Sequence, residues 1–256
     1  MNAETQKTNS DLQEIYQKFK IDLFNLTGRN DINSDLNNFS APLLMNINDE
    51  YLSSSPKVLL IGQETCGWGD GSVMFSTLSR FLNEDIDSVN ILMDTYDKFK
   101  FAEFAKNNTP FWRFYKQLHK KLEIAPYNLQ TDLDRPYPKY IAWTNIFKFD
   151  YKRKALSQEQ KNVFKSINLE LLKKEIKIIK PDMILFVTGW KYDDFIKEFF
   201  TNYSFEKIET GYLARIGHED FPFNTFRTFH PHTLQLRKKF DCVFDLINTN
   251  RKQQVQ

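Results

Sequence analysis

The sequence predicts an α/β fold: one domain with a central sheet of four mostly parallel strands, flanked by helices. Short apolar runs that end at a glycine or a polar residue are typical of buried parallel strands. Longer amphipathic stretches lie between these runs, which is the alternation expected of an α/β domain. The 256 residues suffice for one domain with a sizeable core, and they contain neither an internal repeat nor a Pro/Gly/Ser-rich linker. We therefore expect a single domain.

The first fifty residues are expected to form a helix followed by an irregular wrap. Ser10 is a plausible N-cap for a helix over residues 11–26, where apolar side chains recur at helical spacing. Residues 27–50 are rich in Asn and show no periodicity. We therefore expect residues 1–50 to wrap the surface and residues 51–250 to form the α/β domain.

The remaining elements follow from periodicity and from the signals at their ends. Pro110 suits the first turn of a helix, and Ser157 begins a long helix that Pro181 ends. Gly211 marks the turn of a hairpin predicted over residues 205–215. The predicted strands are residues 56–62, 140–147, 182–187 and 225–229, and the predicted helices are residues 75–81, 110–122, 157–180, 190–200 and 233–247. The strand ends are where open α/β sheets build their ligand sites.

Composition excludes several classes of protein. Cys66 and Cys242 are too few for a disulfide framework or a four-cysteine metal site, and the four histidines lack metal-ligand spacing. No apolar run approaches the ~18 residues of a membrane span, and the first residues lack the apolar stretch of a secretory signal. We therefore expect a monomeric cytoplasmic protein without a metal.

The net charge of +2 does not by itself indicate a nucleic-acid partner. Basic residues nevertheless cluster at 116–121 and at 148–154. Such a cluster is either a solvated face or a phosphate-binding surface, and the second one directly follows a candidate site motif. The cations of this second cluster are Lys148, Lys152, Arg153 and Lys154.

Polar side chains stand at the ends of three predicted strands. Glu64 could act as a base in a partly buried position, or it could cap the next helix. Asn145 could read a ligand edge that offers one donor and one acceptor, or it could tie down a neighbouring loop. His230, which precedes Pro231, could be catalytic or structural. Cys66 could also be a nucleophile with His230 as its base, although no other residue supports that arrangement.

Four segments resemble, in their order and spacing, the motifs of the uracil-DNA glycosylase superfamily. They are residues 58–64 (VLLIGQE), 140–148 (YIAWTNIFK), 179–189 (IKPDMILFVTG) and 230–234 (HPHTL). The second is similar to a motif of the four-cysteine branch, although the cluster-binding cysteines of that branch are absent here. The resemblance spans residues 56 to about 240. It implies a doubly wound sheet, no iron–sulfur cluster and no cofactor.

The resemblance also implies a role for each candidate site residue. Glu64 stands at the position of the carboxylate that activates water, and Asn145 at that of the residue that reads uracil. His230 stands at the position of the residue that stabilises the departing base anion. Phe75 is similar to the aromatic that stacks on the flipped base, and Leu234 to the residue that wedges into the duplex. Gln63, Cys66 and Trp68 are further candidate contacts to the base, and the candidate contacts to the DNA are Lys148, Lys152, Arg153, Lys154 and His232. Residues 65–68 and His232 depart from the motifs of the superfamily.

The resemblance leads us to expect a monofunctional DNA glycosylase that flips a damaged or modified pyrimidine and hydrolyses its N-glycosidic bond. Cys66 stands where another branch has a tyrosine that excludes the methyl group of thymine, so a C5-substituted base is expected to fit as well as uracil. The DNA could be single- or double-stranded, and the setting could be base-excision repair or defence against phage DNA. The alternatives are a non-catalytic nucleic-acid or nucleobase binder with the same fold and a nucleoside or nucleotide hydrolase.

Overall fold

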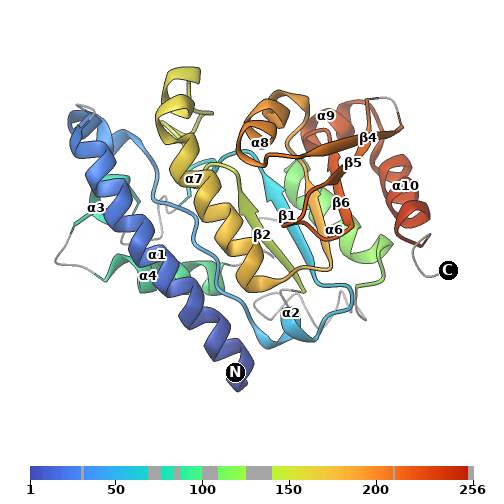
Figure 1. Cartoon of the computed structure of the whole chain (residues 1–256), viewed down its shortest axis with the longest axis horizontal. Helices are drawn as coiled ribbons and strands as arrows, with labels where there is room; N and C mark the ends of the chain where they lie inside the picture. The colour runs from blue at the N-terminus through green and yellow to red at the C-terminus, as the bar shows by residue number, and fades with distance from the viewer. Residues whose placement is uncertain are drawn as a thin grey trace. The chain divides into compact units, whose positions relative to one another are not determined.

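The computed structural model describes residues 1–29, 32–68, 76–83, 87–99, 109–124, 140–209 and 211–252. Among these residues, six strands form one mixed sheet in the order β2-β1-β3-β6-β5-β4 (Figure 1). The strands are β1 (Val58–Gly62), β2 (Ile141–Asn145), β3 (Met183–Phe186), β4 (Ser204–Glu209), β5 (Leu213–Gly217) and β6 (Asn224–Thr228). β3 pairs in parallel with β1 and β6, whereas β5 pairs antiparallel with β6 and β4. The α/β class is therefore confirmed.

The sheet is larger and more mixed than the four mostly parallel strands expected. The hairpin predicted over residues 205–215 is confirmed as β4 and β5, and Gly211 at its turn has a φ of 80°. Its incorporation into the sheet was not expected. One edge of β6 pairs with β3 and the other edge pairs with β5, so the hairpin extends the sheet by two antiparallel strands.

By its internal contacts the chain divides into two compact units, each assembled from three stretches. The first unit contains Met1–Ile47, Gly62–Lys98 and Thr144–Ile179, and the second contains Asn48–Ile61, Phe99–Trp143 and Lys180–Gln256. The predicted boundary at residue 50 lies close to the first change of unit. The stretch before that change is nevertheless not a separate wrap, because it shares its unit with two later stretches.

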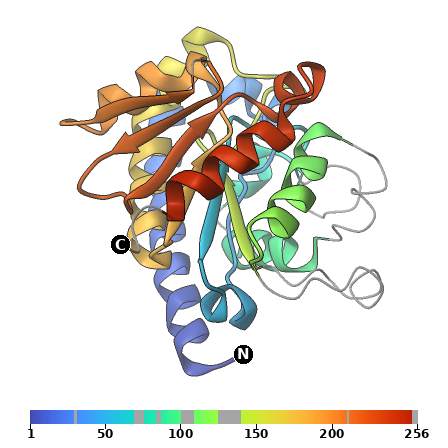
Figure 2. The same cartoon turned by 90° about the vertical axis from the view of Figure 1, so that its right-hand side faces the viewer.

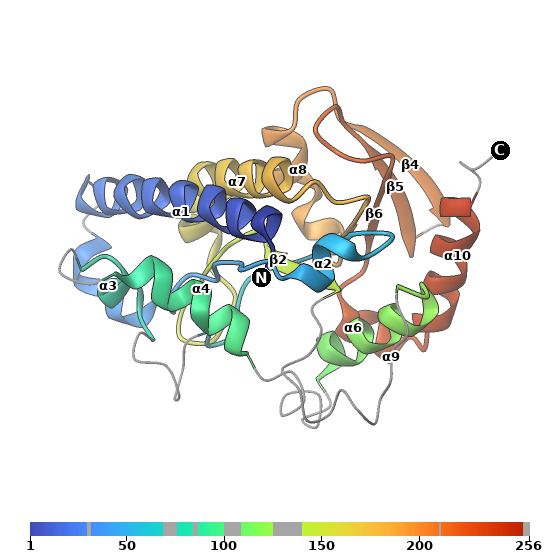
Figure 3. The ribbon, with the colours of Figure 1, turned by 90° about the horizontal axis from the view of Figure 1, so that it is seen from below.

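In the first unit, α1 (Ala3–Arg29) packs along α7 (Gln158–Ile179), as Figure 3 shows. α1 begins well before the predicted residue 11, because the side chain of Asn2, not Ser10, accepts a hydrogen bond from the first turn (2.8 Å). Ser157 caps α7 as predicted, through a hydrogen bond from the first turn to its hydroxyl (3.2 Å). The other helices of this unit are η1 (Ile32–Asn38), α3 (Leu78–Phe81) and α4 (Ser88–Lys98).

In the second unit, α6 (Pro110–Lys121), α9 (Pro231–Leu236) and α10 (Phe240–Lys252) contact one another, and α10 also contacts β6 (Figure 2). α9 and α10 replace the single helix predicted over residues 233–247. They are separate because Lys238 adopts a left-handed φ of 54°, which an α-helix does not accommodate. The other helices of this unit are α2 (Asp49–Ser53), η2 (Trp190–Tyr192) and α8 (Asp193–Phe199). No helix within the described residues is long and apolar enough to cross a membrane.

The parallel strands of the second unit end in register. Ile61 of β1 pairs with Phe186 of β3, which pairs with Arg227 of β6. Just beyond this row, the backbone N–H of Gly189 donates to the carbonyl of Thr228 (3.0 Å). The connections that follow β3 and β6 therefore start at the same end of the sheet, at the carboxyl ends of these strands, where a doubly wound fold places ligands.

Candidate functional site

Glu64 and Asn145, two of the predicted polar residues, stand at the ends of adjacent strands, and both belong to the first unit. β2 is the neighbour of β1 in the sheet. The backbone N–H groups of Ile146 and Phe147, just past β2, donate to the carbonyls of Gly62 and Gln63 at 3.0 Å each. The two strands therefore end side by side. This places the loop that carries Glu64 next to the strand end that carries Asn145.

The carboxamide of Asn145 is nearly buried, with the residue only 4% exposed. Within the described ranges, no side chain or backbone group makes a hydrogen bond to this carboxamide. Oδ1 and Nδ2 of Asn145 are not among the fully buried side-chain atoms that lack a partner, so the carboxamide still reaches the surface of the described structure. A carboxamide at a strand end that has no partner among the described residues is the feature expected of a residue that reads a polar ligand edge.

Glu64 forms an ion pair that the sequence did not indicate. Its Oε1 lies 3.0 Å from Nζ of Lys161 in the first turns of α7, and its side chain is only 4% exposed. The next helix that the structure describes, α3, is capped by Thr77, whose side chain accepts a hydrogen bond from the N–H of Arg80. Lys161 therefore fixes the direction of the carboxylate and supplies the opposite charge that a buried carboxylate requires.

A single carboxylate, that of Asp150, holds the loop that follows Glu64. Its Oδ2 accepts hydrogen bonds from the hydroxyl of Thr65 and the N–H of Gly67, both at 2.7 Å, and its Oδ1 accepts one from the N–H of Arg153 at 2.8 Å. Asp150 is buried whereas its three partners are not, so these charge-assisted hydrogen bonds are partly shielded from water. The loop and the basic segment at residues 151–154 are thereby joined through one side chain, which sequence reasoning missed.

The basic segment is a tight turn, defined as residues 151–154 and named the basic turn. Tyr151 and Lys154 exchange backbone hydrogen bonds (3.0 and 3.1 Å), and between them Lys152 and Arg153 have φ values of 51° and 61°. Left-handed φ costs a non-glycine residue roughly 1 kcal/mol, so packing must impose this shape. Gly67 has a φ of 77°, which favours glycine, and a β-carbon there would lie 3.0 Å from Nε of Arg153. Lys152, Arg153 and Lys154 are all exposed, as phosphate contacts must be.

Lys148 does not belong to this exposed cluster, and its prediction as a DNA contact is wrong. Its side chain is fully buried and its Nζ is paired with Glu175 and bonded to the hydroxyl of Thr144. The other oxygen of Glu175 accepts a hydrogen bond from Tyr16 of α1 (2.9 Å). Burial lowers the pKa of Lys148, and the charge of Glu175 opposes that shift. Lys148 therefore ties the end of β2 to α7 and α1.

The other predicted base contacts have different environments. Cys66 is exposed, and its Sγ lies 3.7 Å from the carbonyl oxygen of Arg153. Trp68 is buried, and Gln63 is half-buried. Phe75 lies outside the described residues. The structure therefore brings together Gln63, Glu64, Cys66, Asn145 and the basic turn within the first unit.

His230 belongs to the second unit and is the N-cap of α9. Its Nδ1 accepts a hydrogen bond from the backbone N–H of His232 (3.3 Å), so the proton of the neutral ring is on Nε2. Burial lowers the pKa of His230 to about 4, and the charge of His232 contributes to the same shift. At neutral pH, His230 therefore presents an uncharged N–H donor just past β6.

Two predictions on α9 have different outcomes. Leu234 is fully buried, so the prediction that it wedges into DNA is wrong for this conformation. The exposed apolar side chain of α9 is Leu236, with an exposed fraction of 71%. His232 is exposed, as a residue that contacts DNA must be. The exposed and buried leucines stand two positions apart, which on a helix puts them on different faces.

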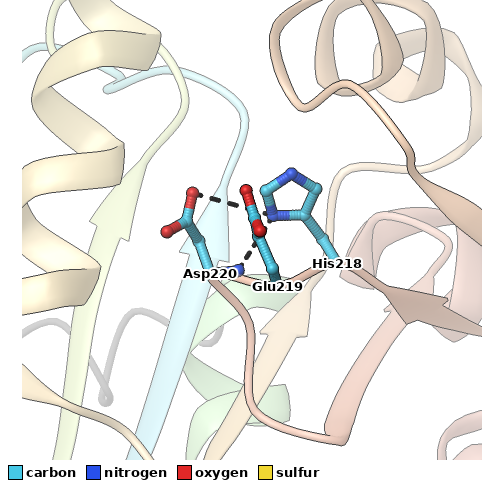
Figure 4. Close-up of side chains that lie close together, drawn as sticks. All are labelled: His218, Glu219 and Asp220. Atoms are coloured by element: carbon cyan, nitrogen blue, oxygen red, sulfur yellow. Dashed lines mark hydrogen bonds and ion pairs between the residues drawn. The ribbon is translucent and has the colours of Figure 1, made fainter.

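One group among the described residues could hold a metal ion: His218, Glu219 and Asp220, whose ligand atoms lie within 4.8 Å of one another (Figure 4). Nδ1 of His218 already accepts a hydrogen bond from the N–H of Asp220 (3.0 Å). The group follows β5 and precedes β6, whereas His230 follows β6. It therefore lies at the opposite end of β6 from the candidate site.

No protein-family model and no curated protein matches this sequence. The chemistry of the site is therefore argued from its own residues. In the first unit these are a buried carboxylate in an ion pair, a carboxamide without a partner among the described residues, and an exposed basic turn. In the second unit, His230 supplies a neutral imidazole donor.

Proposed function

We propose that this protein is a DNA glycosylase that hydrolyses the N-glycosidic bond of a flipped uracil or C5-substituted pyrimidine. The observation that carries the proposal is the nearly buried carboxamide of Asn145, which has no partner among the described residues and stands beside the Glu64 loop. The donor and acceptor of a carboxamide match the O4 and N3–H edge of uracil. The resemblance of four segments to the uracil-DNA glycosylase superfamily supports the same function.

In the proposed reaction, water adds to C1′ of the sugar while the bond from C1′ to the base breaks. Asn145 reads the base edge, and the Glu64 carboxylate orients the water and stabilises the positive charge that develops on the sugar. The resemblance assigns to His230 the hydrogen bond that its Nε2–H donates to the base, which leaves as an anion. A neutral imidazole suits this step, because its N–H donates a hydrogen bond to the developing negative charge while the proton stays on the ring.

The basic turn favours DNA over a free nucleoside as the substrate. Its three exposed cations are Lys152, Arg153 and Lys154. Two of them, Lys152 and Arg153, have left-handed φ values, a conformation that costs free energy. A nucleoside offers no phosphate to them, whereas a polynucleotide offers several. We therefore assign these cations to phosphates next to the flipped base, in either base-excision repair or defence against phage DNA.

One observation favours a second candidate, a non-catalytic binder of nucleic acid. Because Glu64 is paired with Lys161, its carboxylate could serve only to join the loop to α7. In that case Asn145 and the basic turn would still bind a base and its phosphates. The two candidates differ in one property, which is whether a bound base is released.

An oligonucleotide panel distinguishes these candidates. Labelled single- and double-stranded DNA would carry thymine, uracil or a series of C5-substituted pyrimidines at one position, and alkali would cleave any abasic site. The proposal expects cleavage at uracil, at a C5-substituted base, or at both, and no release of base from free nucleosides. Binding without cleavage on every member of the panel would support the non-catalytic binder. Release of base from nucleosides alone would support the nucleoside hydrolase.

A further inference from the structure

Three aromatic residues of the second unit stand at strand ends: Trp190 comes after β3, Phe229 after β6 and Tyr212 before β5. Trp190 follows Gly189, and a β-carbon at Gly189 would lie 3.7 Å both from the ring of Phe229 and from the backbone nitrogen of His230. The ring of Phe229 lies 6.0 Å from that of Tyr212 in an edge-on contact. Trp190 is 62% exposed, whereas Phe229 and Tyr212 are half-buried. This aromatic group therefore begins beside His230 and has one prominent ring.

Each of these rings has a basic side chain over it. Nζ of Lys191 lies 6.0 Å from the ring centre of Trp190, the guanidinium of Arg237 lies 5.1 Å from that of Phe229, and Nζ of Lys239 lies 5.1 Å from that of Tyr212. Lys191 and Arg237 are exposed and Lys239 is half-buried. Aromatic rings interleaved with cations are the composition of surfaces that bind single-stranded nucleic acid.

The segment that carries Phe229, Arg237 and Lys239 is basic, whereas the exposed Asp194 and Glu209 lie three positions from Lys191 and Tyr212. Residues 221–240 contain no aspartate or glutamate, although they include Arg227, Arg237, Lys238 and Lys239. Arg227 is neutralised in a buried pair with Asp193 (2.7 Å), so it does not contribute to the surface. The other cations of residues 221–240, which are Arg237, Lys238 and Lys239, form no such ion pair within this segment. A group of unneutralised cations favours a polyanion as its ligand over a protein surface with few acidic residues.

We infer that this aromatic and basic surface, made of Trp190, Lys191, Tyr212, Phe229, Arg237 and Lys239, holds an unpaired strand of DNA beside the base at His230. The inference rests on the proposed function and names its substrate class: single-stranded DNA. An exposed tryptophan gains from stacking only if a base has a free face, and in a duplex that face is covered by the next base pair. Leu234, the residue expected to open a duplex, is buried.

Binding to undamaged DNA tests the inference without requiring base release. Fluorescence anisotropy would measure the affinity for a labelled single strand of about 15 nucleotides, and for the same strand in a duplex, at equal salt. We expect the wild-type protein to prefer the single strand, and Trp190→Ala to weaken single-strand binding about 10-fold. Trp190→Phe should retain most of the affinity, because phenylalanine also stacks.

Phe223 provides the matched control. It is 51% exposed in the same unit and has the guanidinium of Arg215 over its ring at 4.5 Å, but it is not part of the surface just defined. Phe223→Ala should change single-strand affinity by less than about twofold, as expected for a surface substitution away from the ligand. Arg237→Gln should weaken binding and reduce its salt dependence, by about 0.7 in the slope of log affinity against log salt for one phosphate contact.

The outcomes separate this inference from the proposed function. Unchanged single-strand binding in Trp190→Ala, or a wild-type preference for duplex, overturns the surface even if the protein releases bases. Loss of single-strand binding in Trp190→Ala supports the surface, even if no oligonucleotide loses a base and the glycosylase proposal fails. Equal losses in Trp190→Ala and Phe223→Ala would also overturn the inference, because they would show a general loss of aromatic surface.

Discussion

The strand ends of the two units are held in place by different forces. In the first unit, charges hold them: Glu64 pairs with Lys161, Asp150 accepts three hydrogen bonds from the loop and the basic turn, and Lys148 is buried against Glu175. In the second unit, His230 is uncharged at neutral pH and its ring is oriented by the backbone N–H of His232. Buried charges fix geometry but are costly to disturb, whereas a neutral donor depends on its protonation state.

The largest expected effect comes from breaking the buried pair in the first unit. Lys148→Met leaves the carboxylate of Glu175 without its cation in a fully buried position, and should lower the free energy of unfolding by about 3–5 kcal/mol. Urea denaturation would measure this loss. Lys154→Met, at an exposed site, is the matched control and should change stability by less than about 0.5 kcal/mol.

The double variant Lys148→Met/Glu175→Met sharpens that prediction. Removing both charges removes the desolvation cost of both, so part of the lost stability should return. If the double variant is no more stable than the single one, the cost in Lys148→Met arises from packing and not from an unpaired charge.

In the second unit, His230→Ala should slow base release by about 100-fold or more, or roughly 3 kcal/mol, the scale for loss of one positioned donor. The N-cap of α9 is lost as well, which should cost only about 1 kcal/mol of stability. Single-turnover base release and thermal unfolding would measure the two effects. His232→Ala, which removes an exposed neighbour, should keep the chemical step near the wild-type rate. A fall in stability large enough to explain the lost activity would show that His230 is structural.

A smaller effect is expected at Asp150. In Asp150→Asn, one side-chain oxygen becomes an NH₂ group that faces a backbone or hydroxyl donor, so at least one of three hydrogen bonds is lost. We expect a loss of about 1–3 kcal/mol in stability and weaker DNA binding through the basic turn. Thr65→Val removes only one of these bonds and should cost less. Equal stability of Asp150→Asn and the wild type would show that the carboxylate does not organise the loop and the turn.

The last effect is a dependence of stability on pH that His230 contributes. Its pKa in the folded protein is about 4, below the ordinary value of about 6.5. As pH falls below 6.5 the unfolded chain takes up the proton first, so this contribution is complete above about pH 6.5 and is lost progressively towards pH 4. Urea denaturation at pH 7 and pH 4.5 should show a smaller loss in His230→Gln than in the wild type. An identical loss would mean that His230 does not titrate with a lowered pKa.

The parts of this structure that could be predicted from sequence are those fixed by neighbouring residues. Ser157 caps α7 and Gly211 turns the β4–β5 hairpin as expected, because both signals act within a few positions. The start of α1 was missed because two residues could cap it, and Asn2 does so in place of Ser10. We expected a single domain. The sequence did not indicate two compact units, each assembled from three separate stretches of the chain.

The partners of the site residues could not be predicted, because they are distant in sequence. Asp150 and Thr65 are 85 positions apart, and Tyr16 and Glu175 are 159 positions apart. For the same reason Lys148 was grouped with the exposed cations that follow it. A lysine after a strand has the same sequence signature whether it faces solvent or a buried carboxylate, and only the packing of α7 against α1 decides between the two.

The most direct test of the proposed function compares base release by the wild type and by Glu64→Gln under single-turnover conditions. The substrate is the member of the oligonucleotide panel that the wild type cleaves fastest, and the free base is identified by mass. Glu64→Gln keeps the shape of the side chain but removes its charge, so the variant should bind DNA within a few-fold of the wild type and release the base at least ~100-fold more slowly. Equal rates in the two proteins, or no free base from any substrate with the wild type, would contradict the proposal.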